Sequence, residues 1–135
     1  MADPGELYQA IGQALVDELP DGWRSVEVKC YMIVIFAEFH GTYTTETGET
    51  VSFEVPDDLY DHFTELRDLL YEPGKGAWLS ATFRMDNTGK FSIDYDYDNR
   101  PPFHPQPEDE SWLADLERYP RDPEFIPAWM PRPGS

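Results

Sequence analysis

Cysteine is almost absent from this 135-residue sequence, in which Cys30 stands alone, and long hydrophobic runs are missing altogether. A lone cysteine excludes an intrachain disulfide and a multi-thiolate metal cluster. The longest apolar run, residues 31–37, is far shorter than the roughly 20 residues of a membrane-spanning helix. The first residues, MADPGELYQA, show no basic segment followed by an apolar stretch. We therefore expect no signal peptide and a cytoplasmic protein.

Basic residues are also scarce: 10 Lys and Arg stand against 27 Asp and Glu, which gives a net charge of −17. Nucleic acids and anionic membranes would repel such a chain, so the sequence predicts direct binding to neither. The charge favours a partner with a basic surface and fast, electrostatically guided association with it. Solubility or adaptation to salt would produce the same charge, so composition alone leaves both interpretations open.

Residues that could carry chemistry are few. His40, His62 and His104 fall in three different predicted elements, and no two of them have the spacing of a helical zinc site. No nucleophile motif is present, and no two carboxylates stand out as an acid–base pair. The sequence therefore predicts no catalytic residues, no metal site and no cofactor. Cys30 alternates with Val26 and Val28, which indicates a buried thiol rather than a nucleophile.

The segment Asp94-x-Asp96-x-Asp98 resembles the opening of a calcium-binding loop. However, Asn99 and Pro105 occupy the positions that such a loop gives to glycine and glutamate. The segment also alternates like a strand, so a calcium loop is not predicted.

Hydrophobic periodicity predicts an α+β fold, with an antiparallel sheet of about five strands packed against helices in the order α-β-β-β-α-β-β-α. The predicted elements are a helix from Pro4 to Leu19, one long strand over 25–39, a hairpin of 42–46 with 49–55, a helix that residues 56–58 open and Pro73-Gly74 ends, a hairpin within 78–98, and a short helix over 112–119. We interpret residues 1–135 as a single domain. Its Pro/Trp-rich end, from about residue 99 to 135, is too apolar for a free tail and is expected to wrap onto the body.

The hairpin within 78–98 carries the most specific surface signal. Its second strand alternates an apolar face with an acidic one, which holds Asp94, Asp96 and Asp98 with no cation between them along the strand. Like charges in a row weaken strand pairing, so we predict that these three residues bind a basic partner.

A second acidic group, Glu108, Asp109 and Glu110, precedes Trp112. Carboxylates beside an aromatic ring suit the capture of Arg and Lys by ion pairing and cation–π contact. These four residues are a second predicted partner-binding set. The simpler alternative, a core tryptophan with a solvated acidic rim, stays open.

Two stretches resemble a known family. The first is LYQAI at 7–11 followed by LPDGW at 19–23, and the second is Trp78 followed by TGKF at 88–91 and IDYDYD at 93–98. They are similar to the YezG-like antitoxin, or immunity, proteins. The resemblance implies a small cytosolic α+β protein without catalysis that neutralises a cognate toxin, commonly a nuclease of a polymorphic toxin system. The sequence departs from the family pattern in its Pro/Trp-rich end from Arg100 onward and in its unusually apolar segment 31–39. Immunity proteins diverge where they discriminate among toxins, so the resemblance does not identify the toxin.

Together these observations predict a non-catalytic immunity protein that binds the basic surface of a cognate toxin through an acidic and aromatic face. An acidic adaptor that binds a basic protein segment outside toxin biology is the alternative. A small hydrolase with carboxylates in a cleft is a third interpretation, for which the sequence offers no candidate residues.

Overall fold

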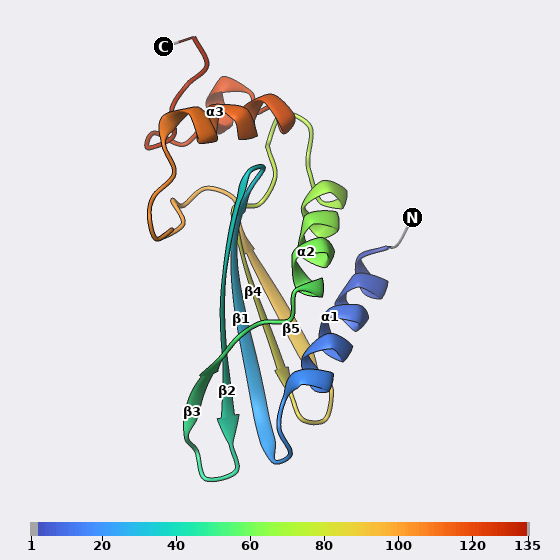
Figure 1. Ribbon diagram of the computed structural model, residues 1–135. Coiled ribbons are helices and arrows are strands. Elements are labelled where there is room, and N and C mark those ends of the chain that lie inside the picture. Colours follow the sequence, from blue (N-terminus) through green and yellow to red (C-terminus); the bar gives the residue numbers. More distant parts are fainter. Residues whose placement is uncertain (1–2, 135) are drawn as a thin grey trace.

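The computed structural model describes residues 3–134 and shows three α-helices and a five-stranded antiparallel sheet (Figure 1). The elements are α1 (Pro4–Glu18), β1 (Trp23–Ile33), β2 (Phe36–Thr45), β3 (Thr50–Phe53), α2 (Asp58–Leu69), β4 (Ser80–Asp86), β5 (Phe91–Asp96), α3 (Asp109–Arg118) and a 3-10 turn, Pro123–Phe125. The strand order is β3-β2-β1-β4-β5. This arrangement confirms the predicted α+β class and element order. Residues 1–2 and 135 of the predicted domain lie outside the described residues.

Helices α1 and α2 pack on one face of the sheet, and α3 lies across one of its ends (Figure 1). The start of α1 follows from its sequence, because the Asp3 side chain accepts a hydrogen bond of 2.8 Å from the backbone N–H of Glu6. Leu7, Ile11 and Leu15 then recur at helical spacing and are buried against the sheet. The apolar stripe of α1 therefore fixes which side of the sheet the helix covers.

The main core lies between these two helices and the central strand, β1. Alternate β1 residues face the helices, and Val28 and Cys30 among them have no exposed surface. Phe83 from β4 and Phe63 from α2 pack into the same cluster and are equally buried. The prediction that Cys30 behaves as a small buried hydrophobe is confirmed. Burial also raises the pKa of its thiol well above the ordinary value.

The predicted single strand over 25–39 is wrong. Strand β1 ends at Ile33, the chain reverses at Val34 and Ile35, and β2 begins at Phe36, which pairs with Ile33. Neither glycine, proline nor asparagine marks this turn, so an apolar run hid it from pattern analysis. A tertiary contact supports the turn instead, because the Val34 N–H donates to the Asp115 carboxylate of α3 at 2.8 Å.

The hairpin of β4 and β5 matches its prediction, with Gly89 at a φ of +87° in the turn after Asp86. On β4 the inward residues Ala81, Phe83 and Met85 are buried. On β5, by contrast, Phe91 remains 43% exposed. This difference arises because β5 is an edge strand and only part of its inner face is covered.

Helix α3 begins at Asp109, three residues before the predicted start, and Glu108 occupies the N-cap position. Beyond it, the C-terminal segment packs around Trp112 through Ile126, Trp129 and Met130. Arg121 is 9% exposed and donates hydrogen bonds to the backbone oxygens of Ala77, Tyr97 and Phe125 at 3.2, 2.5 and 2.9 Å. One arginine thus connects three segments that are distant in sequence.

Candidate functional site

The predicted acidic strand lies on the face of the sheet opposite α1 and α2, at its β5 edge. Asp94 is exposed there, but Arg84 of the neighbouring strand contacts it at 3.2 Å and contacts Glu27 of β1 at 2.8 Å. No cation stands between the aspartates along the strand, as the sequence shows, but the neighbouring strand supplies one to Asp94. Alternation along one strand shows which residues share a face, but it does not show which residue the next strand places beside them.

Asp96 and Asp98 each have a structural contact as well. The Asp96 carboxylate accepts hydrogen bonds of 3.0 Å from the backbone N–H groups of Asp98 and Asn99 and one of 2.8 Å from the Asn99 side chain. Partial burial opposes ionisation of Asp96, but these bonds outweigh it and lower its pKa. The Asp98 side chain lies 3.4 Å from Arg121 and remains 77% exposed. Two of the three aspartates thus also stabilise the end of β5.

The second predicted set separates into a surface part and a core part. Glu108, Asp109 and Glu110 are exposed at the N-terminus of α3, where negative charge is favourable to the helix dipole. Trp112 has no exposed surface and packs edge-on against Phe103 and Trp129. Trp112 therefore belongs to the core and offers no surface to a partner. For this residue the simpler alternative, a core tryptophan beside a solvated acidic rim, is correct.

Trp129 connects the two predicted acidic sets, although it was not among the predicted residues. Its ring lies 5.0 Å from that of Trp112, and its indole N–H donates to the backbone oxygen of Asp98 at 2.7 Å. The Arg100 guanidinium stacks over the same ring at 5.3 Å. The C-terminal segment therefore links the end of β5 to the region of α3, a contact that no local sequence pattern encodes.

Two of the three histidines, His40 and His104, converge on one carboxylate, although they fall in different predicted elements. Glu38 of β2 lies 2.6 Å from His40 Nε2 and 3.1 Å from His104 Nδ1, and it also accepts from the His104 backbone N–H at 2.7 Å. One ligand atom from each residue lies within 4.8 Å of the others, as a small cation site would require. Burial opposes ionisation of Glu38, but the bonds from both histidines prevail and lower its pKa.

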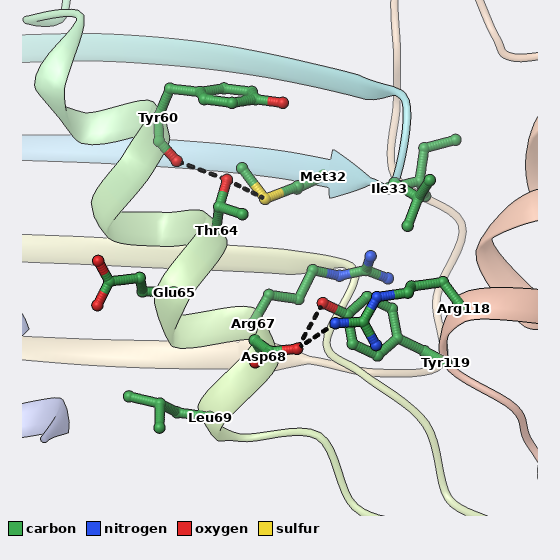
Figure 2. A pocket seen from close by; sticks show the side chains of 11 residues that line it. Met32, Ile33, Tyr60, Thr64, Glu65, Arg67, Asp68, Leu69, Arg118 and Tyr119 are labelled. Atoms are coloured by element: carbon green, nitrogen blue, oxygen red, sulfur yellow. Dashed lines mark hydrogen bonds and ion pairs between the residues drawn. The ribbon is translucent and has the colours of Figure 1, made fainter. Parts of the chain in front are cut away.

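A cleft of about 410 Å³ opens between α2, the β1–β2 turn and α3 (Figure 2). Val34, Tyr60 and Leu69 supply part of its apolar lining, and Asp68 at one end accepts hydrogen bonds from Arg118 and Tyr119. Tyr60 and Leu69 lie on the predicted second helix, and no motif marked either of them. The turn that brings Val34 to the same cleft was not predicted, so the cleft could not be predicted from the sequence.

A buried ion pair holds the end of this cleft together. Arg67 of α2 and Asp115 of α3 form two hydrogen bonds of 2.6 and 2.7 Å, and Arg67 also donates to the Trp78 backbone oxygen at 2.7 Å. Both side chains are almost completely buried. With the Val34 N–H on the same Asp115 carboxylate, α2, α3 and the β1–β2 turn share one polar junction.

A family model described as "Immunity protein YezG-like" matches residues 42–113, more than half of the chain. This chain belongs to the YezG-like immunity protein family. The predicted resemblance is confirmed, and so is the expectation of a non-catalytic protein, because the family consists of immunity proteins rather than enzymes.

Individual relatives agree with this assignment. The chain is 28% identical to Immunity protein YezG of Bacillus spizizenii over 112 residues, which covers 70% of the chain and 69% of the relative. It is 26% identical to Immunity protein YezG of Bacillus subtilis, with 70% and 73% covered. It is also 27% identical to the "Type VII secretion system protein EsaG" of Staphylococcus aureus, with 68% and 66% covered. As an immunity protein, this YezG-like chain has a cognate toxin as its partner.

Within residues 3–134, none of the helices combines the length and the apolar character that crossing a membrane requires.

Proposed function

We propose that this YezG-like immunity protein acts in the cytoplasm by covering the basic substrate-binding surface of a nuclease toxin. The observation that carries the proposal is a net charge of −17 on a chain from an immunity protein family. A nuclease must bind a polyanion, so its cleft is basic, and an acidic protein can associate with that cleft rapidly and block it. One relative is named as a type VII secretion system protein, which supports a toxin exported by that route.

The exposed acids supply the electrostatic part of this proposal. Glu108, Asp109 and Glu110 form no ion pair in the described part of the chain, so among the carboxylates predicted to bind a partner they are the most available. Asp94 is exposed but is already balanced by Arg84. We therefore expect the start of α3 to contribute more to toxin association than the β5 aspartates, and Asp96 and Asp98 to contribute least.

Co-expression with the protein encoded immediately upstream tests this function. Rescue of the host from toxicity, together with a complex that dissociates as salt rises, is the expected result. Survival of the host without any complex, or neither rescue nor complex, would contradict the proposal and favour the adaptor alternative. Purified toxin would then be assayed on DNA and RNA, and hydrolysis of neither would overturn the nuclease assignment.

Charge-neutralising variants locate the acidic surface in the same complex. The triple variant E108Q/D109N/E110Q should lower the association rate about tenfold and reduce its salt dependence, while D94N should change it less than threefold. The triple variant removes no side-chain hydrogen bond or ion pair of the described residues, so it should still fold, with a loss of stability limited to the favourable charge at the helix N-terminus. An association rate unchanged by the triple variant would exclude the start of α3 as the binding surface.

A further inference from the structure

The tip of the β1–β2 hairpin is apolar and exposed, although turns in soluble proteins are usually polar. Val34, Ile35 and Phe36 follow one another and are 37%, 60% and 36% exposed. Tyr60 of α2 is 47% exposed and lines two hollows with this tip, one with Val34 and one with Ile35. Single exposed apolar residues need no explanation, but a cluster of this kind marks an interaction surface.

Tyr60 contributes to the lining of both hollows. The first is the cleft of about 410 Å³ shown in Figure 2, where Tyr60 lies above Thr64 at one end and the contact of Asp68 with Arg118 lies at the other. The second, of about 560 Å³, has a largely apolar lining that includes Ile35, Phe39, Phe53, Val55 and Tyr60. A partner side chain can therefore bury apolar surface against Tyr60 in either hollow.

The charges around these hollows are acidic. Glu65 lines the first hollow, and Glu54 and Asp57 line the second; none of them forms an ion pair within residues 3–134. The two cations of the lining, Arg67 and Arg118, are both paired with aspartates. An apolar centre with an unpaired acidic rim is complementary to an apolar side chain that is flanked by Lys or Arg.

The surface is also held in place before any partner binds. Asp115 accepts the Val34 N–H and the Arg67 guanidinium together, so the turn and α2 are fixed to α3 by buried hydrogen bonds. Figure 1 shows this turn at the end of the sheet nearest α3. A preorganised apolar surface loses little entropy on binding, which is a property of interface hot spots.

From this geometry we propose that Val34, Ile35 and Tyr60 form the apolar anchor for the toxin, and that they receive an apolar side chain carried on a basic segment of it. The proposal rests on the proposed function, and it separates two tasks. The acids at the start of α3 would increase the association rate, while the apolar anchor would slow dissociation.

The test compares two variants that remove exposed apolar side chains of similar size. Ile35→Ser alters the anchor, and Val16→Ser, at a residue of α1 that is 43% exposed, is the matched control. With purified toxin, I35S should raise the dissociation rate at least tenfold and leave the association rate within twofold, because no charge changes. V16S should alter neither rate by more than twofold. Tyr60→Ser should repeat the effect of I35S, and urea unfolding midpoints will show that all variants fold.

If I35S and Y60S dissociate from the toxin at the same rate as V16S, the proposed apolar anchor is wrong, but the proposed function is unaffected. Failure of the wild-type protein to bind the toxin would instead remove the proposed function itself. The mass of the free protein in solution provides a second check. A wild-type dimer that becomes monomeric in I35S would assign the tip to contact between two copies of this chain and would also overturn the anchor.

Discussion

At the scale of single residues, the Arg67–Asp115 pair shows how buried charge organises this molecule. Removing such ions from water costs several kcal/mol for each ion, and only close geometry with further hydrogen bonds offsets that cost. Arg67 meets this condition with three hydrogen bonds, and Asp115 also accepts the Val34 N–H. The pair was not predicted, because Arg67 and Asp115 are 48 residues apart along the chain and no local pattern relates them.

Replacing Asp115 by alanine should therefore destabilise the protein by about 3–5 kcal/mol, since it leaves a buried guanidinium without its counter-charge. The free energy of unfolding in urea measures the change. Asp109→Ala, in the exposed first turn of the same helix, is the control and should cost no more than about 1 kcal/mol. Equal values for the two variants would show that the pair contributes nothing beyond an ordinary surface aspartate.

At the scale of elements, the sequence predicted those segments whose boundaries are encoded locally. The start of α1 has a capping aspartate and a proline, and the β4–β5 turn has Gly89 at positive φ, so both appear where expected. The β1–β2 turn and the start of α3 were misplaced because no local residue pattern marks them. Val34 is held by Asp115, which is 81 residues away along the chain, and no local rule could indicate that contact.

The C-terminal segment depends in the same way on Arg121. Replacing it by methionine removes the donor to three backbone oxygens and should destabilise the protein by about 2–4 kcal/mol, because buried acceptors lose their partners. Arg132→Met is the control, since Arg132 is exposed and its hydrogen bonds are long at 3.2 Å. We expect the control to stay within about 0.5 kcal/mol of the wild type. Urea unfolding followed by tryptophan fluorescence gives both values, and a stable R121M would mean that the segment is held by its apolar contacts alone.

At the scale of the whole molecule, composition predicted the sign of the partner's charge but not the place where it binds. Asp94 and Asp96 lie on the predicted strand, whereas Asp98 follows its end, and Asp109 and Glu110 belong to α3 instead of preceding it. The cations that pair with Asp94 and Asp98 come from β4 and from the C-terminal segment, so sequence alone could not show which carboxylates remain free. The exposed apolar tip was not predicted either. The sequence pattern placed Val34 and Ile35 inside a continuous strand, but the chain turns at these residues and exposes them.

Acid pH should weaken the fold through carboxylates whose pKa is lowered, namely Glu38, Asp86 and Asp96. A lowered pKa means that the folded state favours the ionised form of the carboxylate. The resulting stabilisation is therefore fully present at pH values above the ordinary pKa, 4.5 for Glu and 3.8 for Asp. It is lost as the pH falls below these values. We expect the thermal midpoint to decrease from about pH 5 to pH 3. Glu38→Gln should make this decrease smaller, whereas Glu65→Gln, at an exposed and unpaired position, should leave it unchanged. Identical pH profiles for E38Q and wild type would contradict the assignment of part of the acid sensitivity to Glu38.

Salt should affect folding and toxin binding in opposite directions, because both depend on the net charge of −17. Within the folded chain, like charges repel, and raising the ionic strength from about 0.01 to 0.15 M shortens the screening length from about 30 to 8 Å. The thermal midpoint of the free protein should therefore rise with salt at pH 7. Between the protein and a basic toxin the same screening removes attraction, so the association rate should fall over the same range. Calorimetry of the free protein measures the first effect, and stopped-flow mixing with the toxin measures the second. If the thermal midpoint of the free protein falls with salt, its ion pairs, such as those of Arg84 with Glu27 and Asp94, outweigh the repulsion.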